Sequence, residues 1–217
     1  MLPEVVPMRW IVLLAAWLLA GPALAQGVTA LQLQPGDLLF VTASQNGLSG
    51  AIDDATARAG QVSYDHVALV AGSGEQAQVL HADQLGSREQ PLAVFLREAG
   101  EKQRQVDAYR LRDADPQVIA DGLDQARRLL GKPYNATYVP DEDSLYCSDF
   151  IERAFRAHGI FALQPMNFRN PRTGVIADWW VQFYAGHGMD VPQDVPGSNP
   201  NDMARDPDLQ PLGQVLH

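Results

Sequence analysis

The chain has 217 residues, a formal net charge of -10 and a single cysteine. Its 46% hydrophobic and 19% charged content excludes a wholly disordered protein, and its length suits one domain with an appended segment. With 26 acidic against 16 basic side chains, the chain does not fit a nucleic-acid binder with a broad basic face. One cysteine can form neither an internal disulfide nor a cysteine-rich zinc cluster.

Residues 1–25 have the features of a secretory signal. An almost purely apolar run at 11–20 is followed by Gly21-Pro22 and then by Ala23-Leu24-Ala25. A short apolar core before an A-x-A site is typical of a cleaved signal peptide, and the run is shorter than the ~20 residues of a membrane span. We therefore expect cleavage near Ala25, export to the periplasm or the medium, and no stable transmembrane anchor. An uncleaved N-terminal anchor is the alternative.

Hydrophobic spacing then predicts a mixture of strands and helices. Apolar runs bounded by turn residues predict strands at 38–41, 67–70, 78–82 and 106–111. A Gly-Ser-Gly turn at 72–74 predicts that the second and third strands form a hairpin. Helical spacing and capping residues predict helices at 48–58, 91–96, 115–130 and 144–158, and an aromatic-rich segment follows at 175–184. Strands and helices do not strictly alternate, which indicates an α+β fold with an antiparallel sheet.

The C-terminal stretch 189–217 differs in character from what precedes it. Five prolines fall within 191–217, and little apolar periodicity remains. We expect a domain over 26–188 and, after it, a proline-rich tail that is irregularly packed or disordered.

Cys147 lies near the start of the helix predicted at 144–158. Unpaired N–H groups and the helix dipole at such a position stabilise a thiolate, which predicts a lowered pKa and rapid alkylation near pH 6. The same N–H groups could hold an oxyanion. Cysteine is also among the residue types most often buried, so an inert structural thiol is the alternative.

Two histidines lie at the ends of neighbouring predicted strands. His66 begins the strand at 67–70, and His81 lies in the strand at 78–82, so a hairpin places them on adjacent strands. One could serve as the base that a nucleophilic cysteine needs, while the other orients it. Ordinary structural histidines are the alternative. A metal site with Asp65 or Asp83 is a further one, although no HExxH pattern supports it.

Several short motifs resemble those of NlpC-type papain-like cysteine hydrolases. The segments are His66-Val-Ala-Leu with Val79-Leu-His-Ala, Pro35-Gly-Asp-Leu-Leu-Phe, Gly131-Lys-Pro-Tyr, and Tyr146-Cys-Ser. Both histidines precede Cys147, which is the order of the circularly permuted branch. Over residues 33–159 the chain most resembles the YiiX/YebB-like bacterial members of that branch.

The resemblance implies a circularly permuted papain-like fold, α+β with an antiparallel sheet packed against helices. It implies Cys147 as nucleophile, His66 as base and His81 as the third, orienting residue, with Asp83 as a substitute for His81. Tyr134 and Tyr146, which flank the thiol in the motifs, are the implied oxyanion- or substrate-binding residues. The chain departs from the standard pattern because Tyr146 replaces an aspartate and Asp149 replaces a glycine.

The combined hypothesis is an exported thiol hydrolase that cleaves an amide, first of all in a peptidoglycan stem peptide, through an acyl-enzyme. Fatty-acyl amide or ester hydrolysis, or acyl transfer, is the alternative, and the acidic surface keeps it open. A non-catalytic glycan- or lipid-binding module on the same fold is another, with Trp179, Trp180, Phe183 and Tyr184 as a binding platform or as core residues. We expect no cofactor, no metal and no nucleic-acid partner. The oligomeric state is left open.

Overall fold

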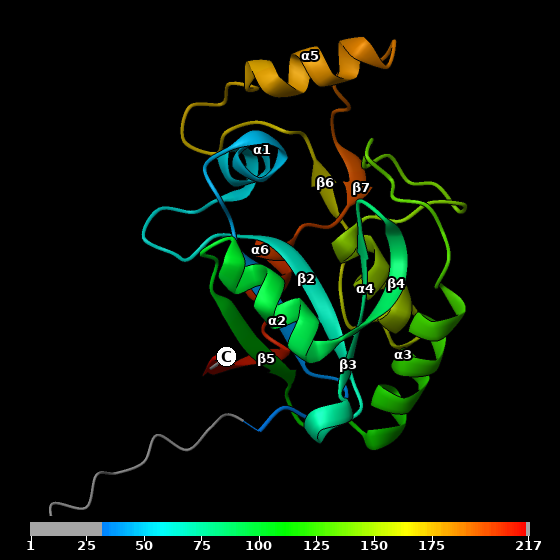
Figure 1. The fold of residues 1–217 in the computed structure, drawn as a ribbon. Coiled ribbons are helices and arrows are strands. Elements are labelled where there is room, and N and C mark those ends of the chain that lie inside the picture. The colour runs from blue at the N-terminus through cyan, green and yellow to red at the C-terminus, as the bar shows by residue number, and fades with distance from the viewer. Residues whose placement is uncertain (1–31, 216–217) are drawn as a thin grey trace, which may run out of the picture.

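The computed structural model describes residues 32–215, so the predicted signal peptide lies outside the described residues. Its centre is a six-stranded antiparallel sheet in the order β4-β3-β2-β1-β5-β8 (Figure 1). The strands are β1 (Leu38–Thr42), β2 (Tyr64–Ala71), β3 (Gln78–Asp83), β4 (Gly86–Pro91), β5 (Val106–Leu111) and β8 (Leu209–Gln214). The four strands predicted from apolar runs are all present.

Helices cover both faces of the sheet because the buried strands are apolar on both sides. On one face, Phe95 and Leu96 of α2 (Leu92–Glu101) pack against Leu39 and Val70. On the other face, α3 (Pro116–Arg128) and α4 (Cys147–Phe155) pack against alternate residues of the same strands. This alternation follows from the two-residue period of a strand.

α3 begins at a capping side chain and packs very closely against α4. Asp115 accepts a hydrogen bond from the Gln117 amide at 2.8 Å and caps α3. Gly122 of α3 lies so close to Phe155 that an added Cβ would stand 2.3 Å from the ring. After α4, the 3₁₀ turn η2 (Arg156–His158) ends at Gly159, which has a φ of 64°.

A third cluster forms beyond the end of the sheet. It joins α1 (Gly47–Thr56), α5 (Asp178–Gly186) and a small sheet of β6 (Gln164–Met166) and β7 (Val195–Gly197). Figure 1 shows α5 at this end, above α1. The Trp180 indole donates to the Ala51 carbonyl at 3.1 Å, and Tyr184 is fully buried. Half of the aromatic segment is therefore core.

The C-terminal stretch is not the irregular tail that we expected. β7, α6 (Pro200–Ala204) and β8 lie within it, and β8 pairs with β5 as an edge strand of the main sheet. Met203 and Leu209 join the same core cluster as α4. The prediction of an irregular tail was wrong for two reasons. An edge strand pairs through its backbone and needs little apolar periodicity, and a proline such as Pro200 is compatible with the first turn of a helix, here α6.

Three further differences concern local boundaries. The polar strand β4 was not predicted, and the turn between β2 and β3 contains the 3₁₀ turn η1 (Gly74–Gln76). The helix expected from 144 begins at Cys147, because Leu145 bonds to the backbone of Pro133 and Asn135 in an extended segment. Between residues 32 and 215, none of the helices is long and apolar enough to cross a membrane.

Candidate active site

Cys147 is the first residue of α4, directly after the extended Tyr146. Its backbone N–H therefore belongs to the set of helix N-terminal donors that have no partner within the helix. The side chain is 4% exposed and lines a cavity of about 330 Å³. The thiol is thus buried from bulk water but adjoins a space that a ligand could enter.

The sulfur lies where β2 and β3 separate. Leu69–Ala71 of β2 pair with β3, but this ladder does not extend to Val67. There the Cys147 Sγ lies 3.8 Å from the Asp65 carbonyl, and the Val67 amide also faces it. Since these two residues flank His66, the thiol is placed beside the backbone of His66.

The structure brings His66 and His81 together. The His66 Nε2 and His81 Nδ1 atoms are 2.9 Å apart, and the two rings meet edge to face. Both rings also contact Phe95 of α2. Both rings therefore lie on the α2 face of the sheet, whereas Cys147 packs on the α4 face. The bond to His81 leaves Nδ1 as the His66 nitrogen available to another group. Within residues 32–215, no hydrogen bond joins either imidazole to the Cys147 thiol, so their catalytic roles stay a prediction.

Burial sets the resting protonation states. It lowers the pKa of His66 to about 3, with the neighbouring His81 adding to the effect, and it lowers the pKa of His81 to about 4. Burial raises the pKa of the Cys147 thiol to about 11 and outweighs the nearby backbone N–H groups, which lower it. At neutral pH the site therefore holds a neutral thiol and two neutral imidazoles. The lowered thiol pKa expected from the helix N-terminus was wrong.

This protonation state predicts slow alkylation of the ligand-free protein. With a pKa of about 11, only ~10⁻⁵ of the thiol is ionised at pH 6, so we expect iodoacetamide to react slowly there and faster only toward pH 11. The rate is measured by mass spectrometry between pH 5 and 11, with a small free thiol of pKa ~8.5 as reference. Rapid modification at pH 6 would mean that a thiolate–imidazolium pair already exists.

The two predicted tyrosines occupy different positions around the cysteine. The Tyr134 hydroxyl lies 3.1 Å from the Tyr138 hydroxyl, and both side chains are close enough for a Cys147 thiolate to raise the pKa of each phenol. Tyr146 lines the cavity, and its hydroxyl accepts a hydrogen bond from the Ser198 amide at 3.1 Å. Its oxygen is thus already engaged by the segment between β7 and α6.

The cavity next to Cys147 is lined by aromatic and aliphatic side chains and by polar ones. Its apolar lining comes from α1, α5, the small sheet and the loops around Tyr138 and Phe168, and its polar lining comes mainly from loops. The apolar side chains include Ile52, Tyr138, Met166, Phe168 and Trp180, and the polar ones include Arg58, Asn167, Arg169, Asn170 and Asp202.

Asp83 is engaged elsewhere, since Arg88 binds both of its carboxylate oxygens across the β3–β4 turn. His81, not Asp83, therefore contacts His66. In the part of the chain from 32 to 215, no group of three or more His, Cys, Asp or Glu side chains could hold a metal ion.

No pattern in the sequence predicted the ion pair of Asp65 and Arg104 at this site. Asp65 is almost fully buried, lines the cavity and is held by Arg104, whose positive charge also interacts with Cys147. Asp65 could have been suspected from its position next to His66. Arg104 lies in a polar loop between α2 and β5 and gave no signal.

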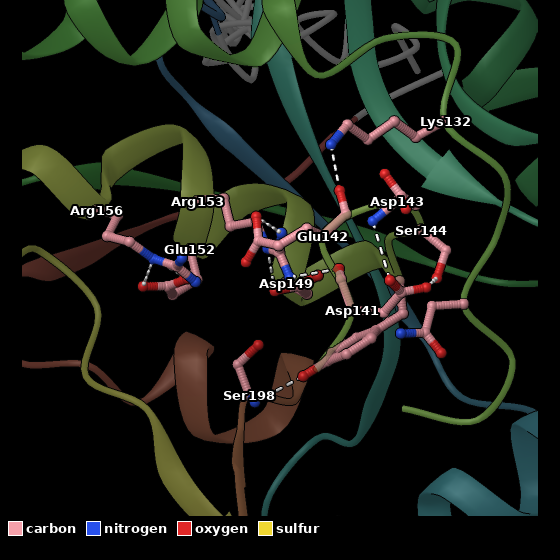
Figure 2. Close-up of polar contacts among 12 residues, drawn as sticks. Lys132, Asp141, Glu142, Asp143, Ser144, Asp149, Glu152, Arg153, Arg156 and Ser198 are labelled. Carbon is pink, nitrogen blue, oxygen red and sulfur yellow. Dashed lines mark hydrogen bonds and ion pairs between the residues drawn. The ribbon is translucent and has the colours of Figure 1, made fainter. Parts of the chain in front are cut away.

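A buried charged cluster supports α4 immediately after the nucleophile candidate (Figure 2). Arg153 donates to the Asp149 carboxylate at 2.8 Å, to Glu142 at 3.1 Å and to the Asp141 carbonyl at 2.8 Å. It thereby ties the loop that leads to Cys147 onto the helix. Burial raises the pKa of Asp149 to about 6 although Arg153 lowers it.

The chain matches a known protein family and is similar to a solved structure. A family model described as permuted papain-like amidase enzymes, YaeF/YiiX, C92 family, matches residues 32–213. The chain is also similar to the crystal structure of "metalloprotein yiiX" from Escherichia coli O157:H7, at 22% identity and a TM-score of 0.67. That alignment covers 83% of this chain and 96% of the other, and it shows a shared fold. No curated protein matches the chain.

Proposed function

Because the chain belongs to the family of permuted papain-like amidases, we propose that it hydrolyses an amide with Cys147 as nucleophile, His66 as base and His81 as orienting residue. Membership makes the chain a hydrolase of the amidase type and agrees with the permuted papain-like fold predicted from the sequence. The residue roles and the substrate are the parts that we propose.

One observation carries the residue roles. The Cys147 sulfur adjoins both a cavity and the backbone on either side of His66, while the His66 Nε2 is bonded to His81 at 2.9 Å. Covalent catalysis needs a nucleophile, a base and an orienting group, and here the sulfur reaches the segment of His66 through its backbone. Catalytic groups are often out of hydrogen-bond range in a ligand-free site, and the proposal requires the His66 imidazole to come within range of the sulfur when substrate binds.

Because the resting thiol and imidazole are neutral, the thiol proton has to move during attack. As the sulfur–carbon bond forms, the thiol proton moves to the His66 Nδ1 and the carbonyl electrons move to oxygen. When the carbon–nitrogen bond breaks, His66 gives this proton to the leaving amine, which leaves a thioester. Water then attacks the thioester, giving one proton to His66, and that proton returns to the departing sulfur.

The developing oxyanion is expected at the N-terminus of α4. The Cys147 N–H is an unpaired helix donor there, and such donors stabilise a tetrahedral oxyanion. The Tyr134 hydroxyl, paired with Tyr138, is the second candidate donor, and burial keeps it protonated by raising its pKa.

For substrate, we propose a peptide amide of the bacterial cell wall, reached after export. The polar lining residues Asn167, Arg169 and Asn170 offer groups that bind peptide carbonyls and carboxylates. The aromatic lining residues Phe168 and Trp180 favour a second candidate, a fatty-acyl amide or ester.

The test is incubation of the protein, expressed without residues 1–25, with peptidoglycan fragments and separately with acyl-lipids. Products are identified by mass spectrometry. We expect one new amine and one new carboxylate per peptide cleaved. Release of fatty acid alone would replace the peptide by the acyl candidate, and binding without any product would support a non-catalytic module.

A further inference from the structure

Tyr138 lies among the aromatic residues that line the cavity. Its ring meets those of Tyr146, Trp180 and Phe168, with ring centroids 5.1, 5.7 and 6.3 Å away. All four side chains line the cavity together with Cys147. The Tyr138 side chain is almost fully buried, and its phenol is close enough for a Cys147 thiolate to raise its pKa. Tyr138 therefore brings a hydroxyl to the aromatic part of the lining, near the candidate nucleophile.

The backbone of Tyr138 is held in a conformation that bulky residues rarely adopt. Its φ is 55°, in the left-handed region. The buried Asn135 fixes this turn, because its side-chain oxygen accepts from the Thr137 amide at 3.1 Å and from the Tyr138 amide at 3.0 Å. The Asn135 side-chain nitrogen also donates to the Val139 carbonyl at 2.7 Å. Strained residues of this kind cluster at functional sites, so the turn points to a function of the Tyr138 side chain.

The hydrogen bond between the Tyr138 and Tyr134 hydroxyls leaves one hydrogen over. The two oxygens are 3.1 Å apart, and only one of the two hydroxyl hydrogens can lie between them. Among residues 32–215, neither hydroxyl has another hydrogen-bond partner, so the second hydrogen must be accepted by water or by a ligand. Tyr138 lines the cavity, whereas Tyr134 is not one of the residues that line it. A ligand in the cavity therefore lies against Tyr138.

The chemistry of the ligand decides whether this second hydrogen finds an acceptor. A peptide has a carbonyl oxygen at every residue and can accept it, whereas a fatty-acyl chain in the same place covers the hydroxyl and offers no acceptor. Leaving a buried polar group unpaired costs more than a typical hydrogen bond gains. A site that contains such a group therefore rejects ligands that cannot pair with it, even where the rest of the lining is apolar.

We propose that Tyr138 is a specificity-determining residue whose hydroxyl donates to a carbonyl oxygen of a peptide substrate and thereby disfavours fatty-acyl groups. The inference rests on the proposed function, for which it selects the peptide over the acyl candidate. It assigns the substrate contact of the phenol pair to Tyr138, while Tyr134 donates to the Tyr138 oxygen and holds it in place. Neither phenol makes or breaks a covalent bond, and neither histidine takes part in the selection.

The test compares two substrates with the same leaving group, acetyl-dialanyl p-nitroanilide and octanoyl p-nitroanilide, on the protein without residues 1–25. The wild type should hydrolyse the peptide anilide with the higher kcat/KM. Tyr138→Phe keeps the ring and removes the hydroxyl, so it should lower kcat/KM for the peptide anilide by about 10-fold or more. The kcat/KM for the octanoyl anilide should stay unchanged or rise. A merely structural role of Tyr138 would lower both values together.

Tyr109→Phe is the matched control, because it also removes one phenol hydroxyl. The Tyr109 hydroxyl lies 3.2 Å from that of Tyr64, and Tyr109 belongs to β5 and does not line the cavity. This variant should leave the ratio of the two kcat/KM values unchanged. An unchanged ratio in Tyr138→Phe would overturn the inference, and so would a ratio that responds to Tyr134→Phe but not to Tyr138→Phe.

Binding measurements separate this inference from the proposed function. Calorimetry with Cys147→Ala protein gives the affinity for each anilide without turnover, and adding Tyr138→Phe should weaken binding of the peptide anilide alone, by about 10-fold. If it does but the wild type cleaves neither anilide, the selectivity stands and the proposed function fails. If the peptide anilide is cleaved and Tyr138→Phe changes neither ratio nor affinity, the function stands and the inference fails. A Cys147→Ala protein that binds no peptide anilide would overturn the inference as well.

Discussion

Replacing Cys147 with alanine is expected to abolish amide hydrolysis, lowering kcat by about 10⁴-fold or more. The reason is that no thioester can form without the sulfur. Stability should fall by only about 1 kcal/mol, because the substitution removes one buried atom at the edge of an existing cavity. Product formation by mass spectrometry and urea unfolding measure the two effects.

Ser144→Ala is the matched control for this variant. It also removes a single side-chain atom, three residues earlier, where the hydroxyl bonds only to the exposed Asp141 carboxylate. It should retain activity. If Cys147→Ala kept substantial activity while a product was still formed, another residue would have to be the nucleophile.

Replacing Arg153 with methionine is expected to cost about 3–5 kcal/mol of folding stability at pH 8. The substitution leaves the buried Asp149 carboxylate without its ion-pair partner, and one oxygen of that carboxylate already has no hydrogen bond in the described structure. The loss should be smaller at pH 5. The pKa of Asp149 is already raised to about 6, and protonation below that pH removes the unpaired charge.

Two further variants separate charge from packing. Arg127→Met removes an exposed arginine on α3 that pairs only with Asp124, so it should cost less than about 1 kcal/mol. Arg153→Met combined with Asp149→Leu replaces the buried pair by apolar groups and should recover most of the loss. Urea unfolding at both pH values measures all four proteins. An equal loss in the single and double variants would show that packing, not the unpaired carboxylate, dominates.

The sequence predicted the elements that have a clear pattern of apolar side chains. The runs at 38–41 and 67–70 are buried on both faces, so their composition alone marks them as strands. β4, with the sequence GSREQP, and β8 are edge strands, and their pairing is made by backbone groups that leave little trace in the side-chain pattern. The start of α4 was misplaced because pairing with the segment of Tyr134, a long-range contact, keeps residues 144–146 extended.

The sequence also predicted part of the candidate site, namely the pairing of the two histidines. The hairpin of β2 and β3 brings His66 and His81 side by side, and that follows from their spacing. The pKa of Cys147 did not follow, because burial depends on packing from β2, α4 and the cavity lining together. Arg104 lies in a polar segment without a motif, so only the folded chain reveals it.

The division of the site between two parts of the chain has a consequence for how substrate preference can change. The groups proposed to react lie on the sheet and at the first residue of α4, whereas most of the cavity lining comes from α1 and from residues 164–202. Substitutions in that lining alter the shape and polarity of the cavity without moving the sulfur or the imidazoles. The chemistry and its selectivity can therefore diversify independently, with one reaction centre serving many different acyl groups.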